Sequence, residues 1–278
     1  MELLQLRYFC DAAQNENFSA TAKKYGVPTS AVSQSIHRLE KELGTSFFSR
    51  QANSIKLNNA GKEFYSKISS SLALMDDAVS SVSKSKQKRT LSIFIDAKRR
   101  HMLRIIEEFK KLYTDIDVNI NHNPTAVKND FDIIIADYDI KLPRYEKHLI
   151  ISEDLAIAIH NTNPLSTHKN LTVDMLKNEP FITMNEQRPM HKTIMNVCKD
   201  FGFVPHITLQ SDDPSYVSRL VSLGMGVAIG PAPSSETYSE NVVFYPIKGY
   251  TRDIYAYVLQ SKQVLPYIND FLTLLTKI

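Results

Sequence analysis

The sequence is poor in cysteine and has no long apolar run. Its two cysteines, Cys10 and Cys198, lie far apart, which excludes a disulfide scaffold and a cysteine-rich zinc or iron–sulfur site. No apolar stretch approaches the roughly 18 residues of a transmembrane helix. The N-terminal segment alternates polar and apolar residues after an acidic second residue. We therefore expect no signal peptide, no membrane contact and a cytoplasmic protein.

Common enzyme motifs are also missing. The chain has no Gly-rich phosphate loop, no G-x-S-x-G nucleophile elbow and no H-E-x-x-H metal motif. Its eight histidines show no metal-ligand spacing. We therefore expect no catalytic residues, no bound metal and no cofactor.

Length and charge indicate two unequal parts. A chain of 278 residues is long enough for about two domains. Residues 1–89 hold 13 Lys and Arg against 8 Asp and Glu, whereas residues 90–278 hold 20 against 22. A basic N-terminal part on a near-neutral body is typical of a nucleic-acid contact, although an excess of this size also arises by chance.

The first 58 residues predict a helix-turn-helix. Hydrophobic spacing indicates three helices, at 3–15, 20–25 and 29–43. We expect Ser19 to cap the second helix, and Thr29 or Ser30 to cap the third. A glycine-containing turn followed by a helix with a polar outer face is typical of a DNA-binding helix-turn-helix. A solvated helix in a bundle would give the same pattern.

Polar residues mark a candidate DNA interface. The third helix would enter the major groove, where its donors and acceptors could meet base edges. Residues 47–50 and 54–57 predict a β-hairpin wing that rests on the backbone or the minor groove. The expected DNA contacts are Ser19, Thr29, Ser30, Ser33, Gln34, His37, Arg38, Lys41, Arg50, Asn53 and Lys56.

A long helix from about Asn59 to Lys86 should follow. Its apolar residues recur at steps of four and three, as in a coiled coil. This seam consists of Phe64, Ile68, Leu72, Met75, Val79 and Val82. An isolated helix that exposes such a seam is unstable in water, so we expect a homodimer; packing on the same chain is the alternative.

From Thr90 onward, strands and helices alternate, which predicts an α/β body with a mostly parallel sheet covered on both faces. We expect strands at 91–95, 118–121 and 131–136, two short strands within 149–159, and further strands at 207–210, 227–229, 242–246 and 254–259. We expect helices at 100–113, 171–177, 190–201, 214–223 and 266–277.

Short motifs that together resemble those of one protein family occur along the whole chain. In the N-terminal part they include Leu6-Arg7-Tyr8-Phe9, Phe18-Ser19, Ala31-Val32-Ser33, Arg38-Leu39-Glu40, Glu42-Leu43-Gly44 and Ala60-Gly61. In the body they include Phe131-Asp132-Ile133-Ile134-Ile135, Glu179-Pro180-Phe181-Ile182 and Gly224-Met225-Gly226-Val227-Ala228-Ile229-Gly230-Pro231. With these motifs the sequence resembles the LysR-type transcriptional regulators.

This resemblance implies an architecture and a function. It implies an all-α winged helix-turn-helix at 1–58, a dimerising linker helix with a hinge at 59–89, and an effector-binding domain at 90–278. That α/β domain would have two lobes like periplasmic solute-binding proteins, lobe I at about 90–155 and 251–278 and lobe II at about 156–250. The implied function is sequence-specific regulation of transcription by a homodimer, usually a homotetramer, on double-stranded DNA. RNA polymerase is a further candidate partner.

Three departures from the family pattern limit what the resemblance carries over. The third helix starts with Pro28-Thr29-Ser30, where the family usually has Ser-Gln-Pro, so the base preference is not transferred. The connection 122–130 is too short for the family's usual helix, which helps to pair effector domains. The first strand of the body leads to the charged run 96–101 instead of small residues.

The resemblance also places an effector site between the lobes. In open α/β sheets, ligands bind beyond the carboxyl ends of strands, at helix N-termini. The expected effector-binding residues are Asp96, Lys98, Arg99, Arg100, Thr183, Arg188, His191, Ser211, Gly224 and Gly226. The basic residues among them predict an anionic effector, such as a carboxylate or a phosphorylated metabolite.

Alternatives remain for the site and for the function. Lys98 and Arg99 could point to solvent or pair with Asp96, Asp137 or Asp139, and a tight turn explains the two glycines equally well. A regulator with a degenerate cleft would answer to no metabolite. A solute-binding protein is the remoter alternative, which the basic N-terminal part opposes.

Overall fold

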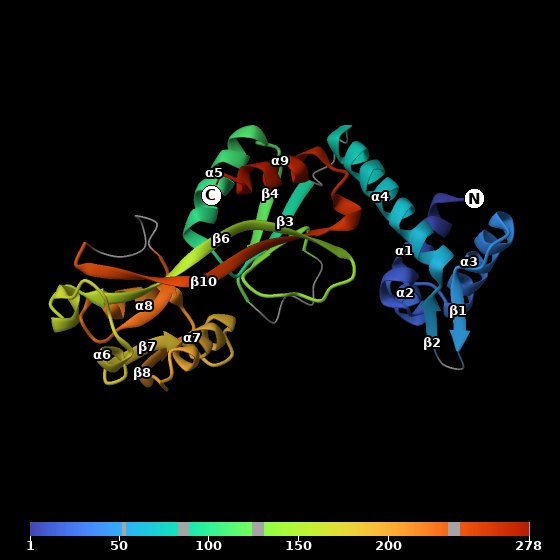
Figure 1. Ribbon diagram of the computed structural model, residues 1–278. Coiled ribbons are helices and arrows are strands. Elements are labelled where there is room, and N and C mark those ends of the chain that lie inside the picture. The colour runs from blue at the N-terminus through green and yellow to red at the C-terminus, as the bar shows by residue number, and fades with distance from the viewer. Residues whose placement is uncertain (52–53, 83–88, 124–130, 233–239, 278) are drawn as a thin grey trace.

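The computed structural model describes residues 1–51, 54–82, 89–123, 131–232 and 240–277. The N-terminal domain consists of α1 (Leu3–Asn15), α2 (Phe18–Tyr25) and α3 (Thr29–Leu43), followed by the antiparallel strands β1 (Phe48–Gln51) and β2 (Ser54–Leu57). Figure 1 shows this domain at one end of the molecule, joined to the rest through the long helix α4. The predicted helices and hairpin are confirmed.

The core of the N-terminal domain is built around Phe9. Its fully buried ring lies 5.0 Å from the ring of Phe47, 5.8 Å from Phe48 and 5.1 Å from Phe64, measured between centroids. Phe47 and Phe64 stack with their centroids 4.6 Å apart. Because Phe64 belongs to α4, the first turns of α4 form part of this core.

The start of α2 differs from the sequence prediction. The Asn17 side chain accepts a hydrogen bond of 3.1 Å from the backbone N–H of Ala20 and so caps the helix. Ser19 lies inside the first turn, so its predicted role as the cap was wrong. Asn and Ser are equally good caps, which is why the sequence alone did not decide between them.

The start of α3 also differs. Pro28, in extended conformation, occupies the N-cap position, and no side chain of the described residues caps the helix. Thr29 and Ser30 are the first helical residues, so the prediction that one of them caps α3 was wrong. The proline has no N–H to satisfy and disfavours a helical residue before it, which fixes where α3 begins.

The helix α4 (Asn59–Val82) packs along the N-terminal domain and continues to the C-terminal domain. Arg7 on α1 donates two hydrogen bonds, of 3.2 and 2.5 Å, to the Asp76 carboxylate on α4. Residues 83–86, also predicted as helix, lie outside the described residues.

The predicted seam on α4 divides into two halves. In the first half, Phe64 packs against the N-terminal core, Ile68 is half-buried and Leu72 is buried. This half fits the alternative of packing on the same chain. The second half is exposed, with relative accessibilities of 46% for Met75, 63% for Val79 and 81% for Val82. These three residues form an apolar stripe, which we call the α4 stripe.

A six-stranded sheet forms the centre of the C-terminal domain. Its strands, in spatial order, are β4 (Ile116–Asn121), β3 (Arg89–Ile95), β5 (Ile133–Ala136), β10 (Val242–Leu259), β6 (Tyr145–His160) and β9 (Ala228–Pro231). The first three strands are parallel, whereas β10 pairs antiparallel with β5 and β6, and β6 pairs antiparallel with β9. The prediction of a mostly parallel sheet was therefore wrong for this half of the sheet.

The strands β6 and β10 are each continuous where two short strands were predicted. They pair along their length, with an irregularity between Pro246 and Thr251. Polar residues near Glu153 and Arg252 interrupt the apolar pattern, which suggested strand ends. Those residues lie between the stretch of each strand that packs in one apolar cluster and the stretch that packs in the other.

Each lobe has its own apolar core. In lobe I, α5 (Arg99–Leu112) and α9 (Pro266–Leu275) cover the sheet, and Phe109 packs against Phe271 with ring centroids 5.3 Å apart. Lobe II contains the parallel strands β7 (Pro180–Met184) and β8 (His206–Ser211) with the helices α6 (Val173–Leu176), α7 (Pro189–Asp200) and α8 (Pro214–Ser222). The strand β7, which begins at a proline, was not predicted from the sequence. Among the described helices, none has both the length and the apolar composition needed to cross a lipid bilayer.

We predict that Met75→Asp weakens self-association of the protein. A charge in an apolar seam removes the burial of the methionine, worth about 1.5–3 kcal/mol, so the dimer dissociation constant should rise at least tenfold. Sedimentation over a concentration series measures this. Ser66→Asp is the control, because Ser66 is exposed on the opposite side of α4. An unchanged mass for Met75→Asp would count against the α4 stripe as the dimer contact.

Candidate functional site

The polar face of α3 is held outward by its apolar face. Val32, Ile36 and Leu39 are fully buried in the N-terminal core. The remaining face presents exposed side chains at Thr29, Ser30, Gln34, His37, Arg38 and Lys41, with Ser33 partly exposed. The helix therefore offers donors and acceptors to a partner as the sequence predicted, while its own packing needs none of them.

The other predicted DNA contacts lie on neighbouring elements. Ser19 is exposed on α2 and Lys56 is exposed on β2. Arg50 belongs to β1, and Asn53 lies outside the described residues. The buried Glu40 of α3 accepts hydrogen bonds of 2.7 and 3.4 Å from the backbone N–H groups of Phe47 and Phe48, which ties the hairpin to α3.

A cleft with a cavity of about 180 Å³ lies between the two lobes. Its charged wall comes from the residues that follow β3 and β5 and from the crossing strands β6 and β10. Its apolar wall comes from lobe II, with Met184, Met190, Ile194, Val217 and Ile229. An apolar cavity of roughly 150 Å³ holds one benzene molecule, so this cleft has room for a small metabolite.

Three helices begin at the cleft. Residues of the first turns of α5, α7 and α8 line it, and both α7 and α8 have proline at their first position. The Asp213 side chain accepts a 2.8 Å hydrogen bond from the backbone N–H of Ser215 and caps α8. Helix N-termini carry partial positive charge, which adds to the basic side chains here.

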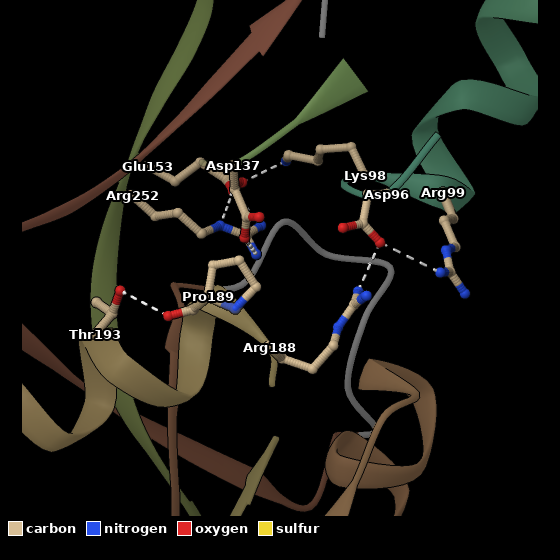
Figure 2. Close-up of polar contacts among 9 residues, drawn as sticks. All are labelled: Asp96, Lys98, Arg99, Asp137, Glu153, Arg188, Pro189, Thr193 and Arg252. Carbon is tan, nitrogen blue, oxygen red and sulfur yellow. Dashed lines mark hydrogen bonds and ion pairs between the residues drawn. The ribbon is translucent and has the colours of Figure 1, made fainter. Parts of the chain in front are cut away.

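The first charge cluster joins the two lobes. Asp96 follows β3 in lobe I, and its carboxylate accepts a 2.7 Å hydrogen bond from Arg188, which precedes α7 in lobe II. Arg99 lies 3.6 Å from the same carboxylate oxygen (Figure 2). In the described part of the chain the Arg99 Nε has no hydrogen-bond partner. One carboxylate and two guanidinium groups give this cluster a net charge of +1.

The second charge cluster lies where the crossing strands meet lobe I. Glu153 and Arg252 are register partners on β6 and β10, and Arg252 donates a 2.7 Å hydrogen bond to Glu153. Arg252 also contacts Asp137 at 3.4 Å, and Lys98 forms an ion pair with Glu153. Lys98 has a left-handed backbone with φ of +57°, and this ion pair helps to hold it there. Two acids and two bases make this cluster neutral.

Burial and charge shift the pKa values around these clusters. Burial raises the pKa of Asp137, against the opposing effect of Arg252. Burial also opposes ionisation of Glu153, but Arg252 and Lys98 outweigh it, so the Glu153 pKa lies below its usual range. Burial raises the pKa of Tyr138 to about 12, and the negative charge of Asp96 adds to the rise. The shift at Glu153 means that its ionised form contributes to the stability of the fold.

The structure brings half of the predicted effector residues to the cleft. Those that line it are Asp96, Lys98, Arg99, Arg100 and Arg188. Lys98 and Arg99 are paired with carboxylates, as the alternative stated, although Glu153 was not foreseen as the partner of Lys98.

The other predicted effector residues do not line the cleft. Thr183 is buried within β7, the His191 Nδ1 lies 2.9 Å from the Met184 carbonyl oxygen, and the Ser211 hydroxyl accepts a hydrogen bond from the backbone N–H of Asp213. His191 and Ser211 therefore form hydrogen bonds within lobe II, whereas the buried Thr183 hydroxyl has no hydrogen-bond partner among the described residues.

Packing explains the two glycines. A Cβ on Gly226 would lie 2.4 Å from the Pro180 carbonyl oxygen, so β7 can approach only a glycine there. Gly224 has a φ of +72° in the turn after α8. The tight-turn alternative therefore accounts for Gly224, whereas Gly226 is required by the close approach of β7.

Glu153 and Arg252 line the cleft but were not predicted from the sequence. Glu153 and Arg252 each interrupt an apolar strand pattern on elements far apart in the sequence. Charged residues inside a strand that is otherwise buried are the signal that could have found them, because a buried charge needs a partner.

Comparison with known families identifies the chain. Residues 3–62 match the model for bacterial regulatory helix-turn-helix proteins of the lysR family, and residues 85–277 match the model for the LysR substrate binding domain. The chain belongs to the LysR family. It is a LysR-type DNA-binding transcriptional regulator with an effector-binding domain.

Curated relatives and solved structures agree with this assignment. The chain is 27% identical over 285 residues to the transcriptional dual regulator GltC of Bacillus subtilis, covering 98% of this chain and 95% of GltC. Its fold is similar to full-length OxyR from Pseudomonas aeruginosa, with a TM-score of 0.60 at 18% identity and coverage of 99% and 98%. It is also similar to full-length CbnR in complex with its target DNA, with a TM-score of 0.55 at 21% identity and coverage of 100% and 99%.

We predict that Glu153→Gln lowers the free energy of unfolding at pH 7. Removing one partner of a buried ion pair costs about 3–5 kcal/mol, and the neutral acceptor that remains should reduce this loss to about 1–3 kcal/mol. The Glu153 pKa is lowered in the folded state, so its contribution is present above its unfolded pKa of about 4.3 and is lost as the pH falls through the folded pKa.

Urea unfolding between pH 7 and pH 3 measures this difference. The gap between wild type and Glu153→Gln should close at the acid end of the series. Glu146→Gln is the control, since Glu146 lies exposed on the same strand and should change stability by less than about 0.5 kcal/mol. A gap that stays constant with pH would show that the charge of Glu153 does not stabilise the fold.

Proposed function

We propose that this LysR-type regulator reads its operator with the exposed face of α3 and responds to a small anionic molecule bound between its lobes. The observation that carries the second part is the net positive Asp96–Arg99–Arg188 cluster, which lies beside an apolar wall and three helix N-termini.

The DNA-reading part rests on the geometry of α3. Gln34 is exposed in the N-terminal half of the helix and Ser33 beside it is partly exposed, where base edges would be met in the major groove. Arg38 and Lys41 follow on the same exposed surface and suit phosphate contacts. CbnR, whose fold this chain shares, has been solved with its target DNA. The full set of proposed DNA contacts is Ser19, Thr29, Ser30, Ser33, Gln34, His37, Arg38, Lys41, Arg50, Asn53 and Lys56.

The effector part rests on the composition of the cleft. A carboxylate or phosphate group would meet the guanidinium group of Arg188, next to Arg99, and its carbon skeleton would contact Met184, Met190 and Ile194. Such a site binds an anion with an apolar body, of a size somewhat above that of benzene.

The assembly and its setting form part of the same proposal. The α4 stripe would pair two chains, and two such dimers would form a tetramer on DNA in the cytoplasm, with RNA polymerase as a partner. We propose the domain division 1–58, 59–89 and 90–278, with lobe I at about 90–155 and 251–278 and lobe II at about 156–250.

One observation favours a second candidate, a regulator that answers to no metabolite. Arg99, Arg188, Lys98 and Arg252 all have carboxylate partners within the cleft. In a cleft whose charges are already paired, the ion pairs can serve only to hold the two lobes together. The response of DNA binding to small anions decides between the two candidates.

We predict that Gln34→Ala relaxes base discrimination. The loss of one base contact should cost about 1–3 kcal/mol on the specific site and little on random DNA. Lys41→Ala is the matched variant, which should weaken all sequences alike and reduce the salt slope by about 1. Fluorescence anisotropy with a specific and a shuffled fragment over a salt series measures both effects. Equal losses on the two fragments for Gln34→Ala would refute its role in reading bases.

We further predict that the purified protein prefers its own upstream DNA over a shuffled fragment by about 10³ or more. Addition of small carboxylates and phosphorylated metabolites to this assay should shift the affinity for at least one of them. A specific complex that no anion shifts would support the metabolite-free candidate.

A further inference from the structure

We propose that Asp96 is an internal counterion that occupies the anion position of the cleft, so that an effector binds by replacing this carboxylate on Arg188. This inference rests on the proposed anionic effector. It makes Asp96 the residue that decides which anions can bind.

The position of Asp96 suits this role. Its backbone N–H donates a 2.9 Å hydrogen bond to the Ile135 carbonyl oxygen, which fixes the residue at the ends of β3 and β5. Its side chain is only 2% exposed and reaches across the cleft to Arg188 of lobe II, whose side chain is 15% exposed. Figure 2 shows the Asp96 carboxylate between Arg188 and Arg99, which come from the two sides of the cleft.

The cluster of Asp96, Arg99 and Arg188 has a net charge of +1, so one more negative charge would neutralise it. Asp96 is shared by two guanidinium groups, and the neighbouring cluster of Lys98, Glu153, Arg252 and Asp137 is neutral by itself. A bound monoanion on Arg188 would bring the first cluster to neutrality, with Asp96 paired to Arg99 alone. Every charged group then keeps a partner, which a buried site requires.

Arg99 provides the place to which Asp96 can turn. It lies in the first turn of α5, three residues after Asp96, and 3.6 Å separates its Nη2 from the carboxylate oxygen that Arg188 contacts. Its Nε has no hydrogen-bond partner among the described residues. A small rotation of Asp96 toward Arg99 would shorten this long contact and release Arg188 for the effector.

A tethered carboxylate also selects between anions. Because Asp96 is attached to the site, its effective concentration is in the millimolar range or above, so a bare anion with no other contact competes poorly for Arg188. A carboxylate with an apolar body gains additional burial on Met184, Met190 and Ile194. The expected effector class is therefore an amphipathic carboxylate, and inorganic phosphate should bind weakly.

Titration of the full-length protein with acetate tests the competition. Asp96→Asn keeps the shape of the side chain and removes the competing charge, so acetate affinity should rise about tenfold. Asp137→Asn is the matched variant, because it removes one negative charge from the same cleft without a contact to Arg188, and its effect should be markedly smaller. Arg188→Gln in the Asp96→Asn background should abolish the gain. Isothermal titration calorimetry at constant ionic strength measures all four proteins.

Two results would overturn the proposal. An equal gain for Asp96→Asn and Asp137→Asn would show a general effect of cleft charge, and no gain for Asp96→Asn would show that Asp96 does not compete. If Asp96→Asn fails to fold, Arg99→Gln provides the independent measurement. Without Arg99, Asp96 should stay on Arg188, so acetate affinity should fall, and an unchanged or higher affinity would contradict the exchange.

The outcome separates this inference from the proposed function. If Asp96→Asn binds acetate more tightly while no anion alters DNA binding by the wild type, the effector function fails and the role of Asp96 stands. If a metabolite alters DNA binding but the Asp96 variant shows no gain, the function stands and the exchange fails.

Discussion

The antiparallel pair of β6 and β10 is the constraint on which the C-terminal domain depends. Both strands run through both lobes, so each contributes to two separate apolar cores. Between the two lobes, neither core covers these strands. Glu153 and Arg252 lie there as register partners. The charged cleft follows from this topology, because polar residues are tolerated only where the two lobes part.

The cleft is a site in which nearly every charge is compensated before any ligand arrives. Lys98, held by Glu153 in a left-handed conformation, fixes the start of α5 and with it the position of Arg99. Buried ion pairs contribute less to stability than their Coulomb attraction suggests, but each broken pair is costly. The arrangement therefore favours a small number of discrete pairings of these side chains over a continuous range.

The sequence predicts the helices and the polar face of α3 well, because their apolar spacing is local and regular. It fails at β6 and β10, where a charge in mid-strand looks like a strand end. It also fails at the start of α2, where Asn and Ser are equally good caps, and at the start of α3, where Pro28 takes the N-cap position. In the cleft, Asp96 to Arg100 could be named because they follow a strand directly. Glu153 and Arg252 could not, because their proximity depends on strand pairing over about a hundred residues.

Phe64 completes the ring cluster of Phe9 and Phe47, yet it belongs to α4. The helix-turn-helix match ends at residue 62, so the matched segment ends before the last residue of the N-terminal core. The N-terminal domain and the first turns of α4 therefore share one apolar core. A chimaera that exchanges DNA-binding domains between two regulators would therefore need its junction after Phe64. A junction at residue 62 would pack the N-terminal core of one protein against the Phe64 position of the other.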